Sequence, residues 1–228
     1  MPATPAASPF IRFLYENGLL LVGTVLVGGT LAGQALTGWH DYNADLEQLR
    51  LPLLTLGQYL GSGHFLEATF ENWESEFLQM GVFVLLTIWL RQKGSSESKK
   101  LYEAEAVDQE PDPNKPGAPG PVRRGGWPLA LYKNSLTIAF FLLFLGSAWL
   151  HARGGAEVYS IEQRHAGRPP LTTVEYLGTT RFWFESLQNW QSEFLSIVAI
   201  VGLSVHLRQQ GSPQSKPVDA GHAETGES

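Results

Sequence analysis

The sequence has no cysteine, and this absence removes several classes of chemistry at once. It excludes disulfide frameworks, thiolate metal sites, iron–sulfur clusters and cysteine nucleophiles. An excess of positive charge is also missing, because 22 acidic residues outnumber 16 basic ones and the formal net charge is −6. That balance argues against a nucleic-acid partner.

Signatures of catalysis and of cofactor binding are missing as well. The sequence has no glycine-rich phosphate loop, and its six histidines show no ligand spacing. No nucleophile–base pair recurs in the two halves of the chain described next. We therefore expect a protein that is not an enzyme and that has no cofactor and no metal site.

What the sequence does contain is one segment written twice. Shifted by 117 residues, residues 14–95 align with 131–212 without a gap, and 29 of the 82 positions are identical. A match of this length indicates duplication and fusion. It predicts two two-helix repeats, at 1–95 and 129–212. The polar, proline- and glycine-containing segments 96–128 and 213–228 are predicted to be a disordered linker and tail.

Four apolar runs predict an all-α polytopic membrane protein with two spans in each repeat. A bilayer core requires about 20 helical residues. The predicted spans lie near 17–37, 73–91, 134–151 and 190–208. A cleaved signal peptide is an alternative for the first run, but its copy is internal and cannot be removed in that way. Core helices of a soluble protein are the other alternative.

Lysine and arginine near the span ends predict the orientation. They gather at the N-terminus, in the linker and in the tail, and they are fewer and balanced by acids between the spans of each repeat. Both termini and the linker are therefore predicted to be cytoplasmic. Each repeat enters and leaves on the same side, so the two are parallel and their pseudo-twofold axis runs along the membrane normal.

About 35 residues separate the two spans of each repeat, and they do not resemble simple loops. Each segment contains a proline, then Tyr-Leu-Gly, and then Ser62 or Thr179, which suits a helix cap. Aromatic residues follow, as is typical of the headgroup layer. We expect a short outer helix and then a long helix that enters the bilayer. The segment either anchors the protein or covers a cavity between the repeats.

The strongest repeated block is Asn-Trp-Glu-Ser-Glu-Phe-Leu at 72–78 and Asn-Trp-Gln-Ser-Glu-Phe-Leu at 189–195. Helical spacing places Asn72, Glu76 and Gln79 on one face, with Asn189, Glu193 and Ser196 in the copy. Carboxylates at a membrane boundary are costly and often functional. The candidate residues are Asn72, Trp73, Ser75, Glu76, Asn189, Trp190, Ser192 and Glu193.

Two interpretations of this motif stay open. In the structural one, Asn72 caps a helix and the glutamates hold the helices together. In the functional one, Glu76 and Glu193 form a symmetric site for a cation or a proton. The sequence thus predicts a structural or accessory membrane protein, with a small channel or transporter as the alternative. Its partners would be the lipid bilayer and either a second copy or an unknown membrane protein.

The repeated block beside a membrane span resembles a family of uncharacterised bacterial integral membrane proteins, classed as a domain of unknown function. The resemblance covers about residues 10–212. It implies a multi-pass protein of the bacterial plasma membrane. It adds no catalytic or binding residues.

Overall fold

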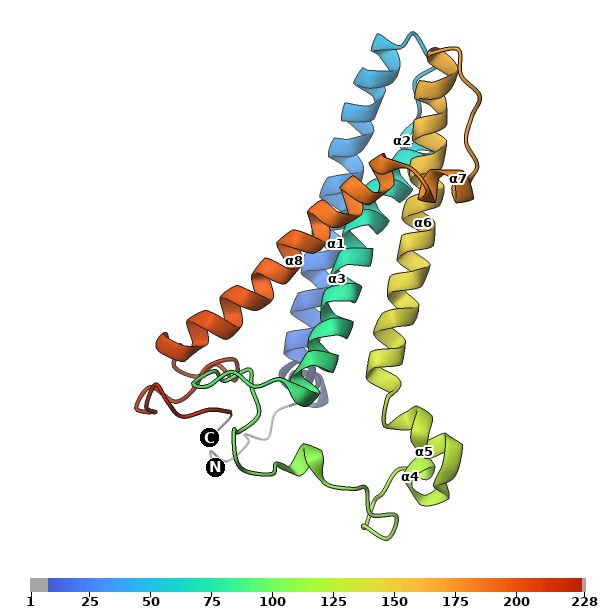
Figure 1. The fold of residues 1–228 in the computed structure, drawn as a ribbon. Coiled ribbons are helices and arrows are strands. Elements are labelled where there is room, and N and C mark those ends of the chain that lie inside the picture. Colours follow the sequence, from blue (N-terminus) through green and yellow to red (C-terminus); the bar gives the residue numbers. More distant parts are fainter. Residues whose placement is uncertain (1–7, 227–228) are drawn as a thin grey trace. The chain divides into compact units, whose positions relative to one another are not determined.

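A computed structural model describes residues 8–226, and the regular elements in that part of the chain are all helical (Figure 1). This confirms the all-α class predicted from the sequence. In chain order the elements are α1 (Pro9–Gln48), α2 (Leu56–Tyr59), α3 (Gly63–Trp89), η1 (Ala106–Asp108), α4 (Gly120–Arg124), α5 (Gly126–Tyr132), α6 (Ser135–His165), α7 (Thr173–Leu177) and α8 (Thr180–His206).

Two of the described helices, rather than the four predicted, are long and apolar enough to cross a membrane. They are α1, which contains the predicted span 17–37, and α6, which contains all but the first residue of the predicted span 134–151. The predicted spans 73–91 and 190–208 largely overlap α3 and α8, which end at Trp89 and His206 and whose first halves carry acidic side chains. Their uninterrupted apolar runs are therefore shorter than the about 20 residues that a bilayer requires.

The chain divides into two compact units, the first ending at Leu66 and the second beginning at Glu67, within α3. The predicted first repeat and tail include residues 1–7 and 227–228, which lie outside the described residues. The predicted linker, 96–128, contains η1 and α4, joined by turns. Its disorder and the predicted domain boundaries stay predictions.

In the first unit, the chain turns back after α1 and returns along the last turns of that helix (Figure 1). Asn43 fixes the return, because its side chain accepts a hydrogen bond from Leu54 N (2.8 Å) and donates one to Leu54 O (2.9 Å). Trp39 Nε1 donates to the same carbonyl oxygen at 2.6 Å. Tyr59 of α2 is thereby buried against Tyr42 and Leu46 of α1.

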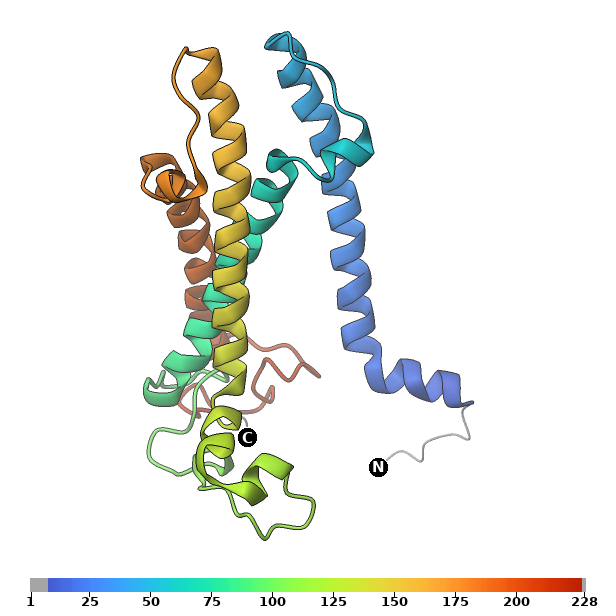
Figure 2. The same cartoon turned by 90° about the vertical axis from the view of Figure 1, so that its right-hand side faces the viewer.

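The second unit makes most of these contacts again, 117 residues further along the chain. Ser160 of α6 takes the place of Asn43, and its hydroxyl bonds to Leu171 N (2.9 Å) and Leu171 O (3.2 Å). Thr172 and Glu175 form a capping box at α7, as Thr55 and Gln58 do at α2. Figure 2 shows the returning segment beside α6. The repeat seen in the sequence is therefore also a repeat of the contacts that turn the chain back.

A glycine in each long helix makes room for the tyrosine of the returning segment. Tyr176 is fully buried, and a Cβ atom on Gly155 would overlap its ring. A Cβ atom on Gly38 would overlap the hydroxyl end of Tyr59 in the same way. The aromatic ring therefore rests directly on the backbone of the helix in both units.

We predict that Gly155→Ala destabilises the protein by about 1–3 kcal/mol, because the buried tyrosine cannot move aside for the added methyl group. The matched control is Gly146→Ala in the same helix, where an added Cβ atom meets nothing within 4 Å. Thermal unfolding in detergent measures the difference. Equal unfolding temperatures for the two variants would contradict the contact.

Candidate functional site

The repeated motif lies in the middle of α3 and α8, and its glutamates face each other. The carboxyl groups of Glu76 and Glu193 are close enough to share a hydrogen bond. One turn further, Gln79 Nε2 donates to Ser196 Oγ at 2.7 Å. Each of these residues thus meets its own copy, and the two predicted polar stripes pack against each other.

The other motif residues mostly bond within their own helices. Asn72 donates to Ala68 O, Ser75 to Asn72 O and Ser192 to Asn189 O. Asn72 does not cap α3, which begins earlier, at Gly63. The predicted cap at Thr179 is confirmed, because its hydroxyl accepts a hydrogen bond from Phe182 N at the start of α8. The tryptophans contribute ring contacts: Trp73 with Phe70 and Phe77, and Trp190 with Phe144 and Trp183.

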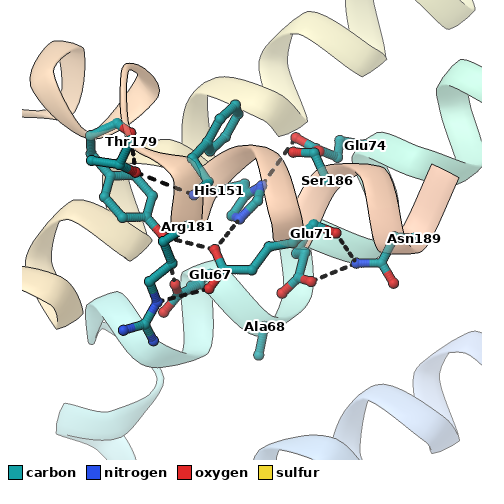
Figure 3. A network of polar contacts seen from close by, with 12 residues as sticks. Glu67, Ala68, Glu71, Glu74, His151, Thr179, Arg181, Ser186 and Asn189 are labelled. Carbon is teal, nitrogen blue, oxygen red and sulfur yellow. Dashed lines mark hydrogen bonds and ion pairs between the residues drawn. The ribbon is translucent and has the colours of Figure 1, made fainter.

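A second polar group lies nearer the start of α3 and α8, around a histidine of α6 (Figure 3). His151 is fully buried. Its Nδ1 lies 3.2 Å from Glu74 Oε2 of α3, and its Nε2 lies 3.5 Å from Glu185 Oε2 of α8. The imidazole is therefore held between carboxylates from two other helices.

Tyr176 and Arg181 hold the carboxylate of Glu185 in place. The Tyr176 hydroxyl donates to Glu185 Oε2 at 2.7 Å and contacts Glu67 Oε1 at 3.3 Å. Arg181 Nε donates to the other oxygen of Glu185 at 2.9 Å, and its Nη1 bonds to both oxygens of Glu162. We refer to the following residues together as the polar centre: Glu67, Glu74, His151, Tyr176, Arg181 and Glu185.

Hydrogen bonds continue from the polar centre along the contact between α3 and α8. Ser186, fully buried, donates to Glu74 Oε1 at 2.6 Å, and Asn189 Nδ2 donates to Glu71 Oε1 at 2.5 Å. On α3, helical spacing puts Glu67, Glu71 and Glu74 on one face, so all three point toward α6 and α8. The first half of α3 therefore presents a row of carboxylates to its neighbours.

Burial and charge shift the pKa values at the polar end of these helices. Burial, together with the nearby charge of Glu185, raises the pKa of Glu67 to about 7. Burial also raises the pKa of Glu71. For Glu185, burial acts in the same direction, but the nearby His151 ring and the hydrogen bonds from Tyr176 and Arg181 outweigh it and lower the pKa. Glu185 therefore keeps its negative charge more readily than Glu67 does.

The region carries more negative than positive charge. Its carboxylates are Glu67, Glu71, Glu74, Glu162 and Glu185, whereas its cationic groups are His151, when protonated, and Arg181. Glu67, His151 and Glu185 also each offer one atom suited to binding a metal ion, and these atoms lie within 4.8 Å of one another. Protons or cations are the species that such an arrangement attracts.

The sequence did not predict the polar centre, because most of its residues are not repeated in the other half of the chain. In the self-alignment, Gln34 aligns with His151, Phe184 with Glu67 and Ala68 with Glu185. Ala68 appears beside the centre in Figure 3. A usable signal was present in the helical spacing of Glu67, Glu71 and Glu74 ahead of an apolar run. The partner residues on α6 and α8 required the fold.

We predict that Ser186→Ala costs about 1–3 kcal/mol of stability, because it leaves one oxygen of the buried Glu74 without its donor. Ser192→Ala is the matched control on the same helix, since Ser192 is exposed and bonds to its own helix backbone. Denaturant titration followed by tryptophan fluorescence compares the two. A control that loses as much stability as Ser186→Ala would contradict the role given to this hydrogen bond.

Comparison with known proteins identifies a family and nothing more specific. No curated protein and no solved structure matches the chain. One family model, described as a domain of unknown function (DUF6766), matches residues 10–227, which is nearly the whole chain. The chain therefore belongs to the DUF6766 family.

Proposed function

We propose that this chain is an integral protein of the bacterial plasma membrane that passes a small cation, in the first instance a proton, along the contact between α3 and α8. In this proposal all four long helices cross the membrane, and both termini are cytoplasmic. The observation that carries the proposal is the continuous row of polar pairs between α3 and α8. The membrane location rests on α1 and α6, which have the length and hydropathy of spans.

Large apolar side chains on the long helices support the lipid-facing part of this proposal. On α1, Leu19 is 94% exposed and Leu20 is 73% exposed, and on α6 Leu142 is 65% exposed. Contiguous apolar surface of this kind is costly in water and suits contact with lipid. For α3 and α8, the acidic first halves meet each other and α6, so crossing the membrane does not require these carboxylates to face lipid.

The polar pairs form steps of one helical turn or less. On α8 the successive residues are Glu185, Asn189, Glu193 and Ser196, and from Asn189 onward each meets a polar side chain of α3. At about 1.5 Å of rise per residue, this stripe covers about 16 Å, roughly half of a bilayer core. A chain of groups that accept and donate protons is the arrangement by which helices relay protons within membranes.

A structural or accessory role, which the sequence alone favoured, is the second candidate function, because the same polar pairs also join helices. Hydrogen bonds between membrane helices stabilise their packing, by about 0.6 kcal/mol on average. A second copy or another membrane protein would then supply the activity. The two candidates differ in what removal of Glu76 and Glu193 changes: transfer of a cation in the first, and stability alone in the second.

The proposed topology is testable with single cysteines, since the natural sequence contains none. In intact cells of an expression host, a membrane-impermeant maleimide should label Glu47→Cys and Val174→Cys, which lie between the spans of each repeat. It should label Asp112→Cys in the linker only after the membrane is opened. Labelling of all three in intact cells, or of none, would contradict the proposed four-span arrangement.

The proposed transfer is testable in vesicles that contain the purified protein and an internal pH-sensitive dye. An imposed potassium diffusion potential should drive proton entry above the rate of protein-free vesicles. The double variant Glu76→Gln/Glu193→Gln should return the rate to that background, because the amides cannot release a proton. The control is Glu157→Gln, which changes an exposed carboxylate of α6.

Two results would contradict this function. One is a proton entry rate equal to that of protein-free vesicles, and the other is an unchanged rate in the double variant. If the double variant instead lowers the unfolding temperature and the natural protein transfers no proton or alkali cation, the accessory role is supported.

A further inference from the structure

We propose that Glu67, His151 and Glu185 form a binding site for one divalent transition-metal ion, with His151 Nε2 and one oxygen of each carboxylate as its ligands. The three candidate ligand atoms lie within 4.8 Å of one another. This site is separate from the Glu76–Glu193 pair, and it does not depend on the proton transfer proposed above.

The state of His151 is the main evidence for an ion. The side chain is fully buried, and neither ring nitrogen makes a hydrogen bond of acceptable geometry to any residue that the structure describes. Both nitrogens nevertheless point at carboxylates, at 3.2 and 3.5 Å. A buried imidazole without hydrogen bonds is costly, and coordination to a metal ion satisfies its acceptor nitrogen.

The distance between Nε2 and Glu185 Oε2 suits two ligands of the same ion. With metal–ligand bonds of about 2.1 Å, neighbouring ligands lie about 3.0–3.4 Å apart in octahedral or tetrahedral geometry. The observed 3.5 Å is close to this range. Glu67 completes a three-ligand set, and the remaining coordination positions would be taken by water or by a substrate.

Neighbouring polar groups fix the orientation of the proposed ligands, as hydrogen-bonded groups commonly do around metal sites. With an ion bound, the proton of the neutral imidazole would lie on Nδ1, which faces Glu74 Oε2 at 3.2 Å, and Nε2 would be free to bind the ion. Ser186 in turn holds Glu74. The second oxygen of Glu185 is held by Arg181. Glu74 is therefore a positioning residue in this site.

Charge and ligand type indicate which ions fit. A dication offsets two of the negative charges that the region carries in excess. One imidazole and two carboxylates, without thiolate, favour manganese, iron, cobalt or zinc in the divalent state over soft ions. Calcium and magnesium prefer sets made of oxygen alone. The inference is therefore a first-row transition-metal site.

Titration of the purified, chelator-stripped full chain with Mn²⁺ tests the site, with free Mn²⁺ followed by electron paramagnetic resonance. We expect one tightly bound ion per chain, and Zn²⁺ should displace it. Glu67→Gln and Glu185→Gln should each weaken binding by about 100-fold, and Glu74→Gln by about 10-fold. The matched control is Glu157→Gln, and the double variant Glu76→Gln/Glu193→Gln should also bind normally.

A spectroscopic signature separates direct binding from a structural effect on folding. The spin-echo modulation of bound Mn²⁺ should show one directly coordinated nitrogen in the natural protein and in Glu74→Gln. That signal should be absent in His151→Gln. Three results would overturn the site: no ion bound per chain, normal binding by Glu67→Gln, or bound Mn²⁺ without a nitrogen signal. Loss of binding only in the Glu76→Gln/Glu193→Gln variant would place the ion elsewhere.

Discussion

The burial of His151 among carboxylates is the constraint on which the rest of the second unit depends. Groups that carry charge are stable inside a protein only when opposite charges and hydrogen-bond partners lie close by. Three helices must therefore meet at this point, because Glu74, His151 and Glu185 come from α3, α6 and α8 respectively. The short α7 adds Tyr176, and the first turns of α8 add Arg181.

The two units share a scaffold but differ in the polar groups placed on it. In each unit a polar side chain of the long helix forms hydrogen bonds with the backbone of the returning segment. This residue is Asn43 in the first unit and Ser160 in the second. The capping boxes of α2 and α7 likewise correspond. By contrast, His151 corresponds to Gln34 and Glu185 to Ala68. Duplication conserved the means of turning the chain, whereas the polar centre joins Glu67 and Glu74 of the first repeat to side chains of the second.

The sequence was sufficient to predict the elements that depend on local patterns. Apolar runs and caps located the long helices and the start of α8 at Thr180. Helical spacing placed Gln79 and Ser196 on polar stripes, and the structure shows that these stripes face each other. The helices proved longer than the predicted spans, because amphipathic turns extend them beyond the apolar runs. Of the described helices, α1 and α6 have the length and hydropathy of a span, whereas the carboxylates of α3 and α8 shorten the apolar part of those helices. The polar centre depends on contacts across more than 100 residues, such as Glu74 with Ser186, and spacing along one helix does not reveal these.

The glycine beneath each tyrosine has a consequence for how the two copies diverged. Because the tyrosine lies directly against the helix backbone, the backbone sets the position of its hydroxyl group. In the first unit that hydroxyl meets the imidazole of His64 at 3.0 Å, and in the second it meets the carboxylate of Glu185 at 2.7 Å. The duplication thus produced two tyrosines that are held in the same way. Substitution at the positions next to their hydroxyl groups gave Tyr59 a basic neighbour and Tyr176 an acidic one.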